Sequence, residues 1–138
     1  MAVRFVQWDE AKMSVNIEEI DKQHQALLNL LDNLFTAVKT GRSNRIFNHL
    51  MTDLLRYAEL HFAVEEDYFK QYCYPERTDH QIKHKEFIDR IQKVIRDLHS
   101  SQADQIETAP GILRSWLVDH IMGIDKKYSY FFNQRGLR

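Results

Sequence analysis

Residues 80–98 read HQIKHKEFIDRIQKVIRDL, and their apolar and histidine positions repeat with the period of an α-helix. The repeat advances alternately by four and three residues through His80, His84, Phe87, Ile91, Val94 and Leu98. Side chains at this spacing lie on one face of a helix and turn toward a common core. The stretch therefore predicts a helix whose buried face begins with two histidines.

The same helical period occurs in three other segments. Their apolar stripes run through Ile20, His24, Leu27, Leu31, Leu34 and Val38; through Ile46, Leu50, Leu54, Tyr57, His61, Glu65 and Tyr68; and through Leu113, Trp116, Leu117, His120 and Ile124. The boundaries of the four helices follow from turn and capping residues. We expect a stop at Gly41, starts at Ser43 or Asn44, at Thr78 or Asp79 and at Thr108, a break at Cys73-Tyr-Pro75, and a polar loop over residues 100–107.

These segments predict an all-α fold, an up-down-up-down four-helix bundle with an N-terminal arm. Four Gly and two Pro among 138 residues leave few turns, which favours long helices. We expect a single domain over residues 1–138, with the arm at 1–17 and the bundle at 18–132. An aromatic tail closes the bundle, formed by Tyr128, Tyr130, Phe131 and Phe132.

Composition and charge exclude several classes of protein. Nineteen basic and twenty acidic side chains give a net charge of −1, unlike a broadly basic nucleic-acid binder or a polybasic membrane sensor. The start lacks the apolar run of a signal peptide, and no apolar stretch approaches the ~18 residues of a membrane span. With Cys73 as the only cysteine, we expect no disulfide and a cytoplasmic location, without nucleic-acid or membrane partners.

Five of the seven histidines occupy stripe positions where a bundle helix normally carries leucine, namely His24, His61, His80, His84 and His120. Glu65 lies one turn after His61, as His84 does after His80, so each pair shares a helix face. One inward histidine is usually an ordinary core residue, but a buried carboxylate is costly unless it is paired or bound to a metal. The whole set therefore favours a metal site over an ordinary core.

Asp125 joins this set only under one condition. It lies five residues after His120, about 140° around a regular helix, so the two converge only if the helix bends or unwinds. Gly123 is suggestive of such an irregularity. His49 and His99 are interpreted as surface residues, because no histidine or carboxylate is expected one turn from either.

Imidazole and carboxylate ligands without cysteine suit iron and, less distinctively, zinc, copper or manganese. Seven protein ligands overfill one coordination sphere, so we expect two ions. Five histidines, two bridging carboxylates and one bridging solvent oxygen would fill all but one position of two six-coordinate ions.

Four motifs resemble, in order and spacing, the ligand motifs of the hemerythrin family. They are Ile20-Asp-Lys-Gln-His24-Gln, His61-Phe-Ala-Val-Glu65-Glu, His80-Gln-Ile-Lys-His84-Lys-Glu-Phe and Trp116-Leu-Val-Asp-His120-Ile-Met-Gly-Ile-Asp125. The opening Trp8-Asp-Glu, with Ser14-Val, is similar to the bacterial branch of the family, bacteriohemerythrin. The resemblance covers nearly the whole chain.

This resemblance implies a non-haem di-iron centre that binds O2 reversibly, with an oxo or hydroxo group between the two iron ions. Carried over by position, His80, His84 and His120 hold one iron, His24 and His61 hold the other, and Glu65 and Asp125 bridge them. O2 binds at the iron with two histidines, in a pocket that must exclude water. The residues expected to form that pocket are Leu27, Phe62, Trp116 and Leu117.

The leading hypothesis is a protein that binds O2 for storage, buffering or delivery, and not an enzyme. One alternative is an O2 or redox sensor module of a signalling protein. A less favoured alternative is a di-iron enzyme that reduces peroxide or nitric oxide, because the sequence offers no further inward acid to supply protons. O2 is the expected partner, a protein acceptor of oxygen is left open, and no catalytic residue is assigned.

Overall fold

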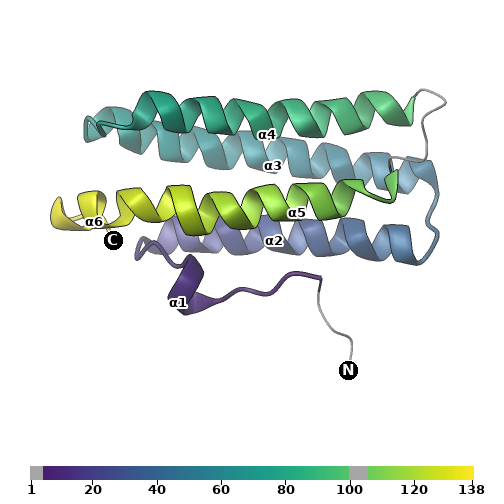
Figure 1. Ribbon diagram of the computed structural model, residues 1–138, viewed down its shortest axis with the longest axis horizontal. Coiled ribbons are helices and arrows are strands. Elements are labelled where there is room, and N and C mark those ends of the chain that lie inside the picture. Colours follow the sequence, from purple (N-terminus) through teal and green to yellow (C-terminus); the bar gives the residue numbers. More distant parts are fainter. Residues whose placement is uncertain (1–4, 100–105) are drawn as a thin grey trace.

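The computed structural model describes residues 5–99 and 106–138, and the regular elements in these ranges are all helices. In chain order they are α1 (Glu10–Met13), α2 (Glu18–Lys39), α3 (Asn44–Gln71), α4 (Arg77–Leu98), α5 (Ala109–Asp119), η2 (His120–Asp125) and α6 (Lys126–Gln134) (Figure 1). The last three follow one another without a break, and η2 between α5 and α6 is a π-helix. The predicted aromatic tail is therefore helical.

The long helices form a closed bundle. α2 packs on α3, α3 on α4, α4 on α5, and α5 returns to α2. The connections after α2 and α3 are short, so successive helices lie side by side in opposite directions (Figure 1). The predicted all-α up-down-up-down bundle with an N-terminal arm is confirmed, and the arm carries the short helix α1, which contacts η2. Among the residues described, no helix is long and apolar enough to cross a membrane.

The apolar core consists of two separate clusters. The larger cluster includes Leu27, Leu31, Met51, Leu54, Phe87, Ile91 and Leu113. The smaller cluster is formed by Val15, Ile17, Ile20, Phe69, Tyr74, Tyr128 and Phe132. On α2, His24 lies between Ile20 of the smaller cluster and Leu27 of the larger cluster. A polar layer thus crosses the bundle between two apolar layers.

The predicted stripe of α3 is wrong in part. Ile46, which was expected in the core, is 40% exposed, whereas Phe47 beside it is 2% exposed. The same shift by one residue occurs at the next position of the stripe, where Leu50 is half-buried and its neighbour Met51 is fully buried. Two adjacent apolar residues fit a helical period almost equally well, so the period alone does not choose between them.

Helix ends follow the predicted turn residues with one exception. At the end of α2, Gly41 has a φ of +66°, and the N–H of Arg42 donates to the carbonyl of Ala37, which closes the helix. α3 begins after Ser43, whose hydroxyl accepts from the N–H of Ile46. α4 begins at Arg77, before the predicted caps at residues 78 and 79. α5 begins after Thr108 as predicted, and most of the expected polar loop, residues 100–105, lies outside the described residues.

The corrected stripe of α3 leads to a stability prediction. Phe47→Ala should lower the free energy of unfolding by about 3–5 kcal/mol, because it opens a cavity in the larger cluster. Ile46→Ala should lower it much less, because 40% of that residue is exposed. Urea unfolding followed by circular dichroism measures both. A larger loss for Ile46→Ala than for Phe47→Ala would contradict the observed register of α3.

Candidate metal centre

All seven predicted ligands lie in the polar layer and none exposes more than 3% of its surface. Each of the four helical segments of the bundle contributes at least one of them: His24 from α2, His61 and Glu65 from α3, His80 and His84 from α4, and His120 and Asp125 from η2, which continues α5. Their ligand atoms form two groups, and the atoms within each group all lie within 4.8 Å of one another. We call His80, His84, His120 and Asp125 the three-histidine group, and His24, His61, Glu65 and Asp125 the two-histidine group.

Asp125 belongs to both groups because its two oxygens point different ways. Its Oδ1 lies 2.8 Å from His80 Nε2 and 3.0 Å from His120 Nε2. Its Oδ2 lies 3.0 Å from His24 Nε2. One carboxylate therefore has one oxygen for each group, which is the arrangement expected of a bridging ligand.

Glu65 also reaches both groups, but with a single oxygen. Its Oε1 lies 2.9 Å from His61 Nε2 and 3.3 Å from His84 Nε2. The other oxygen, Oε2, accepts a hydrogen bond from the buried hydroxyl of Tyr128. Glu65 thus lies between the two groups, and Tyr128 of the smaller apolar cluster holds it in place.

The π-helix η2 brings His120 and Asp125 together. A π turn is closed by i→i+5 hydrogen bonds, so it places residues five apart on one face of the helix. The predicted irregularity is present at the expected place. Gly123 is not sterically required there, because a Cβ at this position would meet no atom within 4 Å.

Partners in this layer stabilise the charged forms of Asp125 and His84. Burial raises the pKa of Asp125, but His120 and the other nearby histidines outweigh burial and hold this pKa well below its usual range. Burial lowers the pKa of His84, but hydrogen bonds to Glu65 and Glu66 outweigh burial and raise it to about 9. His84 therefore carries a proton at neutral pH when no metal is bound, and a metal ion that binds there displaces it.

Two histidines are oriented by partners outside the layer. The Nδ1–H of His61 donates to Gln23 Oε1 at 2.7 Å, and the Nδ1–H of His84 donates to Glu66 Oε2 at 2.8 Å. The acceptor oxygens require the proton on Nδ1 in both rings. The Nε2 atoms are thereby turned toward the layer, as metal-ligating histidines require.

The donor atoms have the separations expected of ligands around an ion. Two ligand atoms that each lie about 2.1 Å from an ion are about 3.0 Å apart when the ligand–metal–ligand angle is 90°. In a tetrahedral site the same two atoms are about 3.4 Å apart. The nitrogen–oxygen pairs of the layer are 2.8–3.3 Å apart. Within the described chain, His24 Nε2, His84 Nε2, Glu65 Oε1 and both Asp125 oxygens are buried without an aligned hydrogen bond. These atoms converge on shared points, so the residues present fit metal ions.

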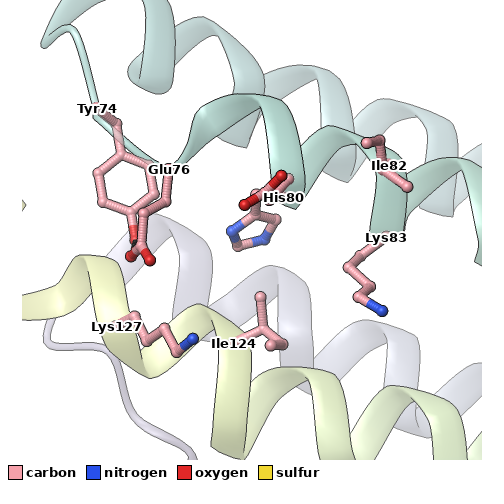
Figure 2. A pocket seen from close by; sticks show the side chains of 8 residues that line it. Tyr74, Glu76, His80, Ile82, Lys83, Ile124 and Lys127 are labelled. Atoms are coloured by element: carbon pink, nitrogen blue, oxygen red, sulfur yellow. Dashed lines mark hydrogen bonds between the residues drawn. The ribbon is translucent and has the colours of Figure 1, made fainter.

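A cavity of about 400 Å³ opens beside the three-histidine group, between α4 and the η2–α6 segment (Figure 2). Its lining includes Tyr74, Lys83, Ile124 and Lys127, and it reaches the ring of His80. Since His80 is 3% exposed, only one edge of the layer meets this cavity. The cavity is thus a solvent approach to the three-histidine group.

The four residues expected to form an O2 pocket lie in two different surroundings. Leu27, Leu117 and Phe62 are buried, and the Phe62 ring stacks on His84 with centroids 3.9 Å apart. Trp116 is half-buried and stacks on His120, with centroids 4.5 Å apart. The closest histidine ring to Phe62 and to Trp116 thus belongs to the three-histidine group, whereas the expectation was a shield over the iron held by His24 and His61.

The two histidines interpreted as surface residues are exposed. One reason given for that interpretation is wrong: His49 does have a carboxylate one turn away, because its Nε2 lies 3.6 Å from Asp53 Oδ2. Both side chains are open to solvent, so this contact is an ordinary surface pair.

The family model of the Hemerythrin HHE cation binding domain matches residues 15–130. The chain belongs to the hemerythrin family. Bacteriohemerythrin from Methylococcus capsulatus is 26% identical over 121 residues, covering 88% of this chain and 92% of that protein. Myohemerythrin from Riftia pachyptila is 30% identical over 121 residues, covering 88% of each chain. The crystal structure of a wild-type hemerythrin shares the fold, with a TM-score of 0.84 at 23% identity over 91% of this chain and 95% of that one.

Three residues of this hemerythrin site were missed by the sequence analysis: Gln23, Glu66 and Tyr128. Each is close in sequence to a predicted ligand, since Gln23 precedes His24, Glu66 follows Glu65, and Tyr128 lies one turn after Asp125. That proximity is the only signal in the sequence. Their contacts are made across helices, which a single helical period does not reveal.

The π turn predicts that the hemerythrin site tolerates one particular deletion. Removing Gly123 would place His120 and Asp125 four residues apart, about 40° around a regular helix, with α6 in an unchanged register. Cobalt(II) bound per chain should therefore stay at the wild-type value.

The matched control is deletion of Lys83, which rotates the rest of the regular helix α4 by about 100° and moves His84 away from the layer. This deletion should reduce the bound cobalt(II). Equal losses in the two variants would show that a regular helix does not replace the π turn.

Proposed function

We propose that this protein binds O2 reversibly at a pair of non-haem iron ions, for oxygen storage, buffering or delivery. The observation that carries the proposal is the buried layer of seven ligands in two groups that share Asp125. His80, His84 and His120 would hold one ion, His24 and His61 the other, with Glu65 and Asp125 reaching both. The two iron ions, with an oxo or hydroxo group between them, would supply the electrons for O2 binding from their reduced state.

The choice of iron is supported by the chemistry of the donor atoms. The ligands are imidazole nitrogens and carboxylate oxygens, without thiolate. Two imidazoles and a carboxylate with an open position are typical of non-haem iron sites that react with O2.

The surroundings of the layer favour binding over catalysis. Among the described residues, the buried polar or charged side chains are Ser14 and the seven ligands. Apart from the hydroxyls of Tyr74 and Tyr128, no buried group of this part of the chain outside the ligands and Ser14 is available to deliver protons to O2. Leu27, Phe62 and Leu117 instead keep water out, and exclusion of water supports reversible binding. We also propose a cytoplasmic location, because the lone Cys73 needs no oxidising compartment.

The test is a visible spectrum of the reduced, iron-loaded protein cycled between nitrogen and air. We expect a spectral change in air that returns fully under nitrogen over repeated cycles. Rapid, one-way conversion to a ferric spectrum would favour the redox-sensor alternative. Sustained turnover of peroxide or nitric oxide would favour the enzyme and overturn the proposal.

The pocket is tested by Leu27→Ala. Leu27 is fully buried and lies one turn after His24, so its removal should admit water next to the two-histidine group. The variant should keep its iron but oxidise to the ferric form markedly faster in air, as measured by absorbance.

The control is Leu34→Ala, which removes an equally buried leucine about 10 Å farther along α2. Both substitutions should cost about 2–5 kcal/mol of stability. Only Leu27→Ala should change the rate of oxidation. Equal rates in both variants and the wild type would show that Leu27 does not shield the O2 position.

A further inference from the structure

In each ligand group, one histidine donates a hydrogen bond to a side chain that is not itself a predicted ligand. The charge of that side chain differs between the two groups. In the two-histidine group, His61 donates to the neutral amide oxygen of Gln23. In the three-histidine group, His84 donates to the carboxylate of Glu66. The two hydrogen bonds are almost equal in length, at 2.7 and 2.8 Å, so charge is the main difference between them.

Both partners reach across the bundle from the preceding helix. Gln23 on α2 holds a histidine of α3, and Glu66 on α3 holds a histidine of α4. Each also adjoins a ligand in sequence, so its backbone is fixed by the same layer. The geometry of the two partners is therefore equivalent, and neither is a chance surface contact.

An anionic partner makes an imidazole a stronger ligand than a neutral one does. A carboxylate that accepts the Nδ1–H increases the electron density at Nε2 and stabilises the positive charge that a bound cation brings. An amide oxygen orients the ring without adding charge. The side chain of Glu66 is 34% exposed, so it also remains in contact with water.

We propose that Glu66 and Gln23 make the two metal positions unequal, so that the three-histidine group binds a divalent cation first and more tightly. Glu66 strengthens that group through His84, and Gln23 orients His61 while leaving the two-histidine group weaker. Glu66 and Gln23 are positioning residues, since each acts through a histidine. The inference rests on the two-metal site of the proposed function, but not on O2 binding.

The experiment is an anaerobic titration of metal-free protein with cobalt(II), which gives one binding constant for each of two steps. The wild type should bind two ions, the first more tightly. Glu66→Gln should weaken the first step by about 10- to 100-fold and leave the second nearly unchanged. Gln23→Glu should strengthen the second step, and the double variant should bring the two constants together. A gain of affinity in Gln23→Glu is a result that a merely structural role would not produce.

The matched control is Glu59→Gln, the same chemical change on an exposed residue about two turns earlier on α3. Both of its constants should equal those of the wild type. Constants within twofold of the wild type in both Glu66→Gln and Gln23→Glu would overturn the inference while the two-metal site stands. If Gln23→Glu does not fold, Glu66→Gln decides alone. A wild type that binds fewer than two ions would overturn the inference and the proposed function together.

Discussion

The placement of two carboxylates and five imidazoles in one buried layer is the constraint on which the rest of this structure depends. Removing a carboxylate from water costs several kcal/mol unless opposite charges surround it. Asp125 meets this condition by facing histidines from three helical segments, with one oxygen for each ligand group. The four helical segments must therefore place their ligands at the same level along the bundle axis. The π turn of η2 allows the fourth segment, α5–η2–α6, to do so.

The apolar clusters on both sides of the layer give it rigidity and dryness. The smaller cluster contributes Tyr128, whose ring packs near His80 and whose hydroxyl holds Glu65. The larger cluster contributes Phe62 and Leu27, which cover the layer from the other side. Because packed side chains leave little room for water, the same contacts that stabilise the bundle also limit the access of water to the ligands, as the proposed O2 binding requires. Stability and the proposed function thus depend on the same residues.

Helices and inward ligands could be predicted from the sequence because both follow from a period of 3.6 residues along one chain. Residues whose role depends on another helix could not be predicted in this way. Gln23 and Glu66 lie on α2 and α3 but hold histidines of the next helix. Asp125 could be predicted only conditionally, since its convergence with His120 depends on a π turn. The choice between Ile46 and Phe47 was set by packing against neighbouring helices.

Extended X-ray absorption at the iron edge, combined with iron analysis of anaerobically loaded protein, tests the central claim most directly. The claim is that one layer of seven side chains holds two ions joined through shared carboxylates. The account predicts two iron ions per chain, less than about 4 Å apart, with nitrogen and oxygen ligands. A single iron per chain in fully loaded protein, or two ions without an iron–iron signal at that distance, would contradict it.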